Sequence, residues 1–398
     1  MKLFRGLGGK KEGELTRKQK VQAKIRRIQT LPWHVAAVLA LVLILLACMS
    51  QFLVPKTYSY EETGGNENKI TLDFVGDVML DRGVKKLGKV SGREKVFSNM
   101  TDWWGHADLV FANLESAVLK SDASDYEETQ KAIHLWTDYA GLESARRAGV
   151  NVFSCANNHM FDYGEKAVLE LLDYFRKEEI TYSGIGESLE DASVYRMIEC
   201  NGVKIAFLAI TDVFLGDFAA TESNGGVLTT AYTDYNMKVY QAAQEADLTI
   251  VYFHWGKENG TSVSDEQISR GHQLIDAGAD IVIGSHPHVV QEVELYEDGI
   301  IFYSLGNFIF DQGNTYARDS VMVEYTAYDG GIGEFRLYPV RINDAIPSVT
   351  TNWFYKARIN RELSQGLAKD SYYLDENGFI VIPFDISIDT SLDSSISD

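Results

Sequence analysis

Five short polar clusters in this sequence each follow an apolar run, and together they hold residue types that bind metal ions. The most informative cluster is Gly284-Ser285-His286-Pro287-His288, in which two imidazoles two residues apart follow the apolar residues 281–283. Polar residues at the ends of neighbouring buried strands meet at one edge of a sheet, so the clusters predict one shared site. The other four clusters are Gly76-Asp77, Asn113-Leu114-Glu115, Asn157-Asn158-His159 and His254-Trp255-Gly256.

The donor atoms in these clusters suit a divalent cation. The candidate metal ligands are Asp77, Glu115, Asn158, His254, His286 and His288. Their mixed oxygen and nitrogen atoms indicate Mn, Fe or Zn, as one ion or two, and exclude a structural zinc site built from thiolates. Glu115 could bridge two ions, because a carboxylate has two oxygens, and two ions about 3.5–4 Å apart would clamp a tetrahedral group.

Three further residues are candidates for a catalytic role. His159 stands beside a candidate ligand and could protonate a leaving oxygen. Asp81 and Arg82 follow the first cluster, and Arg82 could offer a bidentate fork to an anionic group near Asp77. A surface ion pair between Asp81 and Arg82 is equally compatible with the sequence. Asp77 could also be only a turn residue, and Asn157-Asn158 could cap a helix.

The elements that would carry these clusters alternate between strands and helices, which predicts an α/β fold with a largely parallel sheet. After Asp311 the pattern changes, and Asp329-Gly330-Gly331 predicts a hairpin that adds antiparallel strands at 320–328 and 332–340. The expected buried strands cover residues 70–75, 108–112, 150–155, 203–210, 248–253, 281–283 and 300–304. The expected helices include residues 142–148, 165–176, 234–245 and 265–277.

The charge of the 398-residue chain is divided unevenly. Residues 1–34 hold ten Lys or Arg and two Glu, a charge of +8. Because the net charge of the whole chain is −20, the remaining residues carry −28. Residues 35–54 are uncharged and long enough for a bilayer core of about 30 Å, which predicts one transmembrane anchor. The basic flank predicts a cytoplasmic N-terminus and an extracellular main domain at the cell membrane. Leu45-Leu46-Ala47-Cys48 allows a lipid-modified Cys48 instead, although an uncleaved anchor fits the long leader better.

The remaining segments complete the organisation. Residues 55–69 are polar and are expected to form a linker, residues 70–341 the main domain, and residues 342–398 a C-terminal extension with an acidic tail. Cys155 and Cys200 form no disulfide framework and are expected to be free thiols. The acidic main domain argues against nucleic acid as a partner.

The order of these motifs resembles the CapA/PgsA-type capsule synthesis proteins of membrane-bound poly-γ-glutamate systems in Gram-positive bacteria. That family looks like a branch of the calcineurin-like metallophosphoesterase superfamily, whose fold is two packed sheets flanked by helices. The resemblance covers about residues 70–340, and the N-terminal anchor also fits it. The segments that carry it are Phe74-Val75-Gly76-Asp77-Val78-Met79, Asn113-Leu114-Glu115, Ile133-His134-Leu135, Ala156-Asn157-Asn158-His159, Asp162-Tyr163-Gly164, His254-Trp255-Gly256, Asp276-Ala277-Gly278-Ala279-Asp280, His286-Pro287-His288, Tyr303-Ser304-Leu305-Gly306-Asn307-Phe308, Phe310-Asp311-Gln312-Gly313 and Arg318-Asp319-Ser320.

The resemblance implies that the six candidate ligands occupy metal positions and that His159 occupies the general-acid position. The chain departs from the superfamily at Met79, where a His is usual, and at Glu115, where an Asp is usual. The implied function is an extracellular, membrane-anchored component of poly-γ-glutamate synthesis or export, with other synthase subunits and an anionic polymer as partners. A stand-alone metal-dependent hydrolase of phosphoesters or amides, and a scaffold without catalysis, are the alternatives.

Overall fold

The computed structural model describes residues 33, 35, 37–43, 69–214, 216–328 and 333–385. Contacts divide the chain into two units, Met1–Lys56 and Thr57–Asp398. The described residues of the first unit are helical, and no helix among all the described residues is long and apolar enough to cross a membrane. Most of the predicted anchor at 35–54, Cys48, and all but the last residue of the predicted linker at 55–69 lie outside the described residues.

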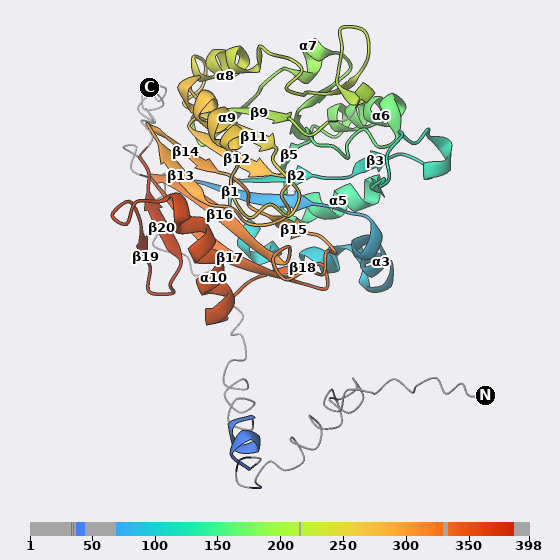
Figure 1. The fold of residues 1–398 in the computed structure, drawn as a ribbon. Coiled ribbons are helices and arrows are strands. Elements are labelled where there is room, and N and C mark those ends of the chain that lie inside the picture. Colours follow the sequence, from blue (N-terminus) through green and yellow to red (C-terminus); the bar gives the residue numbers. More distant parts are fainter. Residues whose placement is uncertain are drawn as a thin grey trace, which may run out of the picture. The chain divides into compact units, whose positions relative to one another are not determined.

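The described part of the second unit is built around two sheets, of ten and six strands (Figure 1). The larger sheet has the order β19-β20-β17-β16-β1-β2-β5-β6, with β15 beside β1 and β18 beside β17. Its strands are β1 (Lys69–Val78), β2 (Leu109–Leu114), β5 (Val152–Ser154), β6 (Thr181–Ser183), β15 (Asn307–Ile309), β16 (Asp319–Tyr328), β17 (Gly333–Asn343), β18 (Ile346–Val349), β19 (Tyr373–Leu374) and β20 (Ile380–Pro383).

The smaller sheet has the order β13-β14-β12-β11-β9-β8. Its strands are β8 (Arg196–Cys200), β9 (Val203–Thr211), β11 (Leu248–His254), β12 (Ile281–Ser285), β13 (Val293–Tyr296) and β14 (Gly299–Phe302). Two short pairs lie outside both sheets: β3 (Ala117–Leu119) with β4 (Trp136–Asp138), and β7 (Ile185–Gly186) with β10 (Gly226–Val227).

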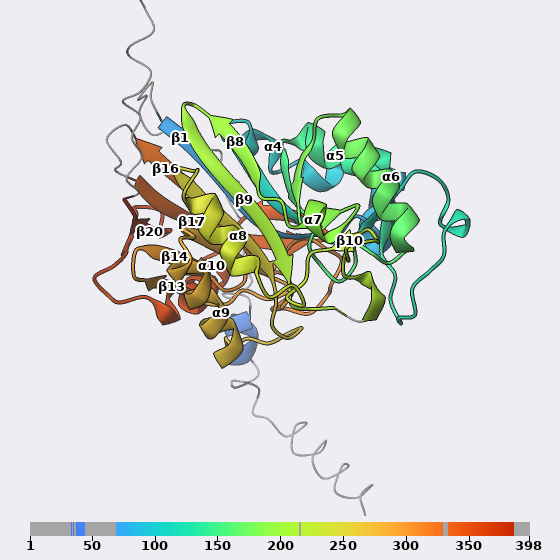
Figure 2. The same cartoon turned by 90° about the horizontal axis from the view of Figure 1, so that it is seen from above.

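Helices cover the outer faces of the two sheets (Figure 2). On the smaller sheet, Val239 of α8 and Leu274 of α9 share an apolar cluster with Val251 and Val282 of the strands. On the larger sheet, Phe175 of α6 stacks on Phe153 of β5. The helices are α3 (Arg82–Ser91), α4 (Thr101–Trp104), α5 (Tyr139–Ala148), α6 (Gly164–Lys177), α7 (Leu189–Ala192), α8 (Tyr235–Ala243), α9 (Asp265–Asp276) and α10 (Trp353–Leu363).

The inner faces of the two sheets pack on each other. Phe111 of β2 meets Phe207 of β9 edge to face, with ring centroids 5.4 Å apart. The buried hydroxyl of Tyr252 in β11 has one proton to share between two acceptors in the opposite sheet, the backbone oxygens of Val75 (3.2 Å) and Phe111 (3.1 Å). A buried Tyr hydroxyl needs such a partner, so these contacts fix the position of one sheet on the other. The expected α/β class with two packed sheets and flanking helices is therefore confirmed.

The strands predicted after Asp311 are confirmed, because β16 and β17 pair antiparallel. The predicted turn at 329–331 lies outside the described residues. The domain boundary expected between 341 and 342 falls inside β17, and β20 pairs with the same strand. Strands β18, β19 and β20 within residues 342–385 therefore belong to the larger sheet, and the rest of the predicted extension lies outside the described residues.

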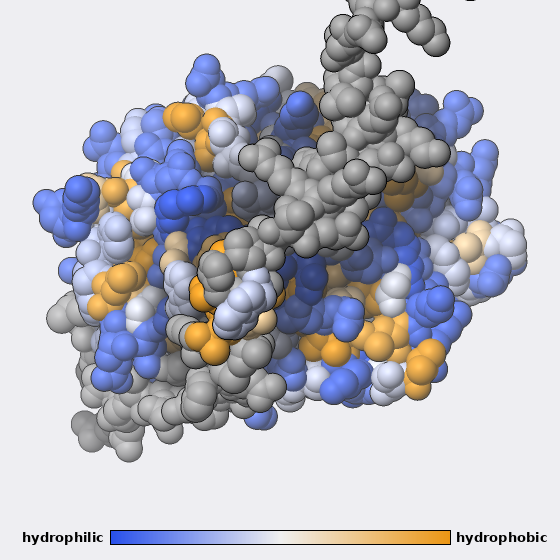
Figure 3. Space-filling view, turned by 60° about the horizontal axis from the view of Figure 1, so that its bottom comes forward, coloured by the Kyte–Doolittle hydropathy of each residue, from blue (hydrophilic) through white to orange (hydrophobic). Residues whose placement is uncertain are grey.

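Parallel pairing brings the carboxyl ends of several strands to one edge. In the larger sheet β1, β2 and β5 run parallel, and in the smaller sheet β9, β11 and β12 do. The five polar clusters lie at the carboxyl ends of β1, β2, β11 and β12 and in the loops that follow β2, β5, β11 and β12. On the face shown in Figure 3, the described surface is mainly hydrophilic, and hydrophobic residues form separate patches.

Candidate metal centre

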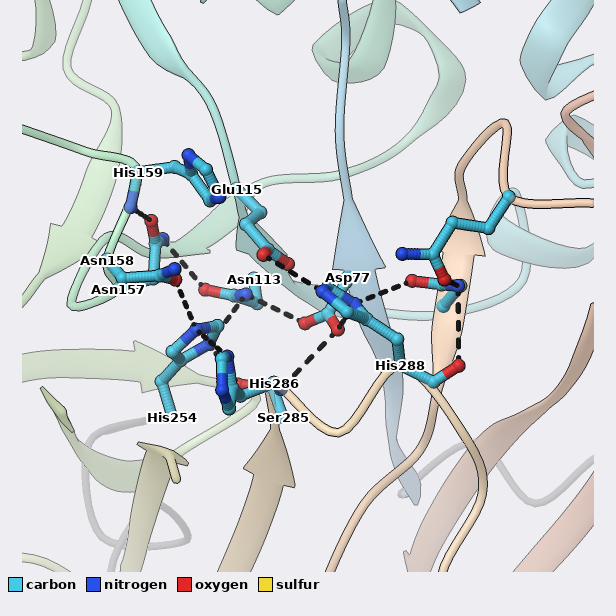
Figure 4. A network of polar contacts seen from close by, with 12 residues as sticks. Asp77, Asn113, Glu115, Asn157, Asn158, His159, His254, Ser285, His286 and His288 are labelled. Carbon is cyan, nitrogen blue, oxygen red and sulfur yellow. Dashed lines mark hydrogen bonds and ion pairs between the residues drawn. The ribbon is translucent and has the colours of Figure 1, made fainter. Parts of the chain in front are cut away.

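The six predicted metal ligands converge at the edge where both sheets end (Figure 4). Asp77 lies in β1, Glu115 directly follows β2, and Asn158 lies in the loop after β5. His254 is the last residue of β11, while His286 and His288 follow β12. Asp77, Glu115 and the three histidines are at most 4% exposed, so the centre is buried between the sheets.

His254 is the middle of one group of donor atoms. Its Nε2 lies 2.8 Å from Asn158 Oδ1 and 3.1 Å from His286 Nδ1. Burial, followed by the nearby imidazoles, holds the pKa of His254 well below its usual range. Burial and the neighbouring His288 lower the pKa of His286 to about 3. Both rings are therefore neutral at pH 7, the form that binds metal ions.

His288 belongs to a second group, which includes Asp77. Its Nδ1 lies 3.1 Å from Asp77 Oδ2 and 2.9 Å from Asn307 Oδ1. Its Nε2 faces Glu115, with 3.6 Å to Oε1. The backbone is strained here, since His286 and His288 adopt φ values of +93° and +59°. Such strain persists where the surrounding structure enforces it, and it is characteristic of functional sites.

Glu115 lies between the two groups and is the least satisfied residue in the site. One donor atom of Glu115 lies within 4.8 Å of donor atoms of Asp77 and His254. Neither of its carboxylate oxygens has a hydrogen-bond partner among the described residues, although the side chain is fully buried. Burial and the charge of Asp77 raise its pKa well above the usual range. A buried carboxylate without a partner is costly, and a divalent cation among these imidazoles would satisfy it. The residues present therefore fit a metal ion.

His159 lies at the rim of the centre and is oriented by Asp162. Its Nδ1 is 2.8 Å from Asp162 Oδ2, and burial lowers its pKa. Lys131 forms an ion pair with Asp162 and donates to the backbone oxygen of Asn158 at 2.6 Å. This arrangement fixes the imidazole ring, and the role of His159 as a proton donor stays a prediction. The role of Lys131 was not predicted, because no sequence pattern links it to the distant cluster that contains His159.

The other two candidate catalytic residues do not join the centre. Arg82 pairs with Asp311 at 2.5 Å, and its guanidinium lies over the Phe310 ring at 5.3 Å. Asp81 accepts a hydrogen bond from the backbone N–H of Trp136 at 3.1 Å. The expected pair of Arg82 with Asp81 is therefore replaced by one with Asp311 in the described residues, and the anion fork near Asp77 stays a prediction. Arg82 approaches the centre only through Phe310, whose ring packs on His288.

Asn113 and Asn307 contact the candidate ligands, and neither was assigned a role from the sequence. Asn113 Nδ2 donates to Asp77 Oδ1 at 2.8 Å, and Asn113 Oδ1 accepts from Asn157 Nδ2 at 3.1 Å. Asn307 contacts His288, as described above. Asn157 is therefore part of this network, and the helix nearest to it begins only at Gly164, so it caps no helix. Both asparagines lie in motifs noted in the sequence, which was the available signal.

A cavity of about 1920 Å³ opens onto the centre at Asn158, His159 and His286. Its wall carries more acidic than basic side chains. The acidic ones are Glu127, Glu128, Asp212, Asp217, Glu258 and Glu266, and the basic ones are Lys131, Lys257 and Arg270. A substrate of considerable size could reach the metal ligands through this cavity.

Comparison with known proteins identifies the family. The family model described as Bacterial capsule synthesis protein PGA_cap matches residues 71–312. The chain belongs to this family. All six candidate ligands and His159 fall within the matched residues, and the family predicted from the motifs is confirmed.

Relatives of this capsule synthesis chain have consistent names. "Capsule biosynthesis protein CapA" of Bacillus anthracis is 35% identical over 348 residues, which cover 86% of this chain and 84% of that protein. "PGA biosynthesis protein CapA" of Bacillus subtilis (strain 168) is 35% identical over 314 residues, covering 78% of this chain and 80% of that protein.

Two solved structures show a weaker likeness. The 5′-nucleotidase precursor from Thermus thermophilus has a TM-score of 0.34 and 14% identity, over 75% of this chain and 58% of that chain. TT1561 of the same organism has a TM-score of 0.38 and 11% identity, over 65% of this chain and 98% of that chain. At these TM-scores the site of neither protein can be transferred to this chain.

Proposed function

We propose that this chain is a membrane-anchored, outward-facing component of poly-γ-glutamate capsule synthesis or export, and that its metal centre acts on the anionic polymer. Family membership and the names of the Bacillus relatives support the capsule role. The uncharged residues 35–54 behind a basic N-terminal segment support the anchor. Other subunits of the synthase complex are the proposed partners.

The main support for a metal centre is the buried carboxylate of Glu115, which has no hydrogen-bond partner among the described residues. A buried carboxylate whose two oxygens lack partners, beside neutral imidazoles, is what a divalent cation would complete. The cation would act as a Lewis acid on an amide or phosphoryl oxygen. The residues that would hold it are Asp77, Glu115, Asn158, His254, His286 and His288.

The remaining residues of the site bind and move protons. Because Asp162 holds Nδ1 of His159, Nε2 is the nitrogen left to exchange a proton with a group in the cavity. The charge of Lys131 compensates Asp162. The acidic cavity wall repels a polyanion, so we expect the polymer to be held at the metal ligands and not along the wall.

The His159–Asp162 pair also favours a second candidate, a stand-alone metal-dependent hydrolase of the metallophosphoesterase type. This candidate predicts that the purified full-length chain turns over phosphoesters or envelope amides by itself, and that a chelator abolishes turnover. The first candidate predicts little turnover without the partner subunits.

Complementation of a capsule-deficient strain that lacks the corresponding gene tests the proposal. We expect the Asp77→Ala/His288→Ala double variant, at normal protein level, to reduce polymer yield by about tenfold or more. His272→Ala is the matched control, because that ring stacks on Tyr296 and is not one of the metal ligands. Wild-type polymer yield from the double variant would exclude a role of the metal centre in synthesis. Full yield after deletion of residues 35–54 would exclude the anchor.

A further inference from the structure

The end of β1 contributes only one ligand to the centre. Asp77 faces the other ligands, but the side chain two residues further on is Met79. Its sulfur accepts a hydrogen bond from the backbone N–H of Asp81 at 3.1 Å and is directed to its own loop. Asp77 is therefore the ligand that the end of β1 offers to the second group of donors, around His288.

Glu258 offers a carboxylate on the solvent side of the centre. It lies in the loop after β11, is exposed, and lines the cavity. One of its oxygens lies within 4.8 Å of donor nitrogens of His286 and His288. Within residues 69–214, 216–328 and 333–385, no hydrogen bond or ion pair is found for Glu258. Its charge thus faces the two imidazoles without a counter-charge.

The loop that carries Glu258 is fixed to the metal-binding segment. The backbone N–H of Asn259 donates to the carbonyl of Pro287, between the two histidines, at 2.8 Å. The buried Gln291 holds the next residue through Nε2, which donates to the Gly260 oxygen at 2.8 Å. Asn259 has φ +58°, a left-handed conformation that this bonding maintains. Glu258 is therefore placed beside the histidines by a defined loop.

A second observation on the other side of the histidines also points to a cation. The two oxygens of Glu115 are buried without a hydrogen-bond partner among the described residues, and Oε1 lies 3.6 Å from His288 Nε2. Donor atoms of Asp77 and Glu115 lie within 4.8 Å of each other and of His254, while Glu258 stands equally close to His286 and His288. Carboxylates therefore stand on both sides of the histidines, and this mixed set of oxygen and nitrogen donors suits a divalent cation.

We propose that Glu258 is a further metal ligand, which closes the solvent side of the centre beside His286 and His288. It supplies a second carboxylate to the group around His288, beside that of Asp77. This inference rests on the metal centre of the proposed function. A ligand in the cavity wall also means that a polymer which reaches the metal must pass Glu258.

Mn²⁺ titration of the purified full-length chain in detergent tests this assignment, with free Mn²⁺ measured by electron paramagnetic resonance. We expect Glu258→Gln to weaken Mn²⁺ binding by about 10- to 100-fold. Glu258→Asp keeps the charge but shortens the side chain, and we expect it to weaken binding as well. Asp217→Asn removes another exposed charge from the same cavity and serves as the matched control, with binding expected within about twofold of the wild type.

The outcomes separate this inference from the proposed function. Wild-type affinity in Glu258→Gln, together with loss of binding in His288→Ala, would overturn the Glu258 assignment and leave the centre intact. Wild-type affinity in Glu258→Asp would mean that charge alone acts, and would overturn ligation by Glu258. Absence of Mn²⁺, Zn²⁺ and Fe²⁺ binding by the wild-type chain would overturn both proposals. Because Glu258 is exposed, its variants should have the same Tm as the wild type in EDTA. This measurement checks that the variants fold.

Discussion

Replacement of Glu115 by Gln should have opposite effects on stability without and with metal. Gln has nearly the same shape as Glu and carries no charge. In the metal-free chain the substitution removes a fully buried carboxylate that lacks partners, so it should stabilise the fold. In the metal-loaded chain it removes a ligand between Asp77 and His254, so the stabilisation from metal binding should shrink.

The expected sizes follow from burial and linkage. Relief of a poorly compensated buried carboxylate contributes about 1–3 kcal/mol to the free energy of unfolding of the metal-free variant. Metal at 1,000 times the dissociation constant stabilises the wild type by about 4.1 kcal/mol. A variant with 100-fold weaker binding gains only about 1.4 kcal/mol at the same concentration. The difference in the free energy of unfolding between the wild type and Glu115→Gln should therefore change by about 2.7 kcal/mol when metal is added.

Thermal unfolding of the full-length chain in detergent, in EDTA and in excess Mn²⁺, measures these values. At roughly 2 °C per kcal/mol, metal should change the Tm difference between the two proteins by about 5 °C. Asp280→Asn is the control, because Asp280 is a partly buried carboxylate in another part of the fold, whose pKa desolvation raises to about 6. Its effect should be independent of metal. An equal Tm difference in EDTA and in Mn²⁺ for Glu115→Gln would refute Glu115 as a ligand.

Two further predictions concern other buried carboxylates. Asp73 lies opposite Glu324 in the sheet, and burial and then Glu324 raise its pKa well above the usual range. The folded state therefore binds a proton on Asp73 more tightly than the unfolded state does. Wild-type stability should fall as pH rises above about 4. Because Asn does not titrate, the Tm of Asp73→Asn relative to the wild type should rise with pH. A pH-independent Tm difference would contradict this. Asp162→Asn removes the partner of His159 and Lys131, and should lower polymer yield about tenfold at wild-type Mn²⁺ affinity in titration. Unchanged polymer yield would show that His159 needs no such orientation.

The candidate ligands could be predicted because their positions follow from local patterns. An apolar run that ends in Asp, Glu or His places that side chain at a strand end, and parallel strands bring their ends together. His286 and His288 were found in this way, and so were Asp77 and His254. The strand–helix alternation also predicted the main buried strands, with bounds that differ by a few residues at the ends, whereas the two packed sheets followed only from the family resemblance.

The contacts between distant loops could not be predicted in the same way. Arg82 pairs with Asp311, which is 229 residues away, and no period in the sequence links the two. Glu258 follows a recognised cluster, but only the fold of its loop brings it to the histidines. The strands after residue 341 are short, so the sequence gives little sign of them. They join the larger sheet because β20, near the end of the described residues, pairs with β17.

The centre is more consistent with selection for chemistry than for stability. Asp77 and Glu115 come from the larger sheet, and His254, His286 and His288 from the smaller one, so the site spans the packed interface. Two strained histidine backbones and an unpaired carboxylate each destabilise the metal-free fold. A divalent cation would compensate the charge and join the two sheets through their ligands. Metal binding should therefore strengthen the contact between the two sheets. The stability of the domain then depends on whether the site holds metal.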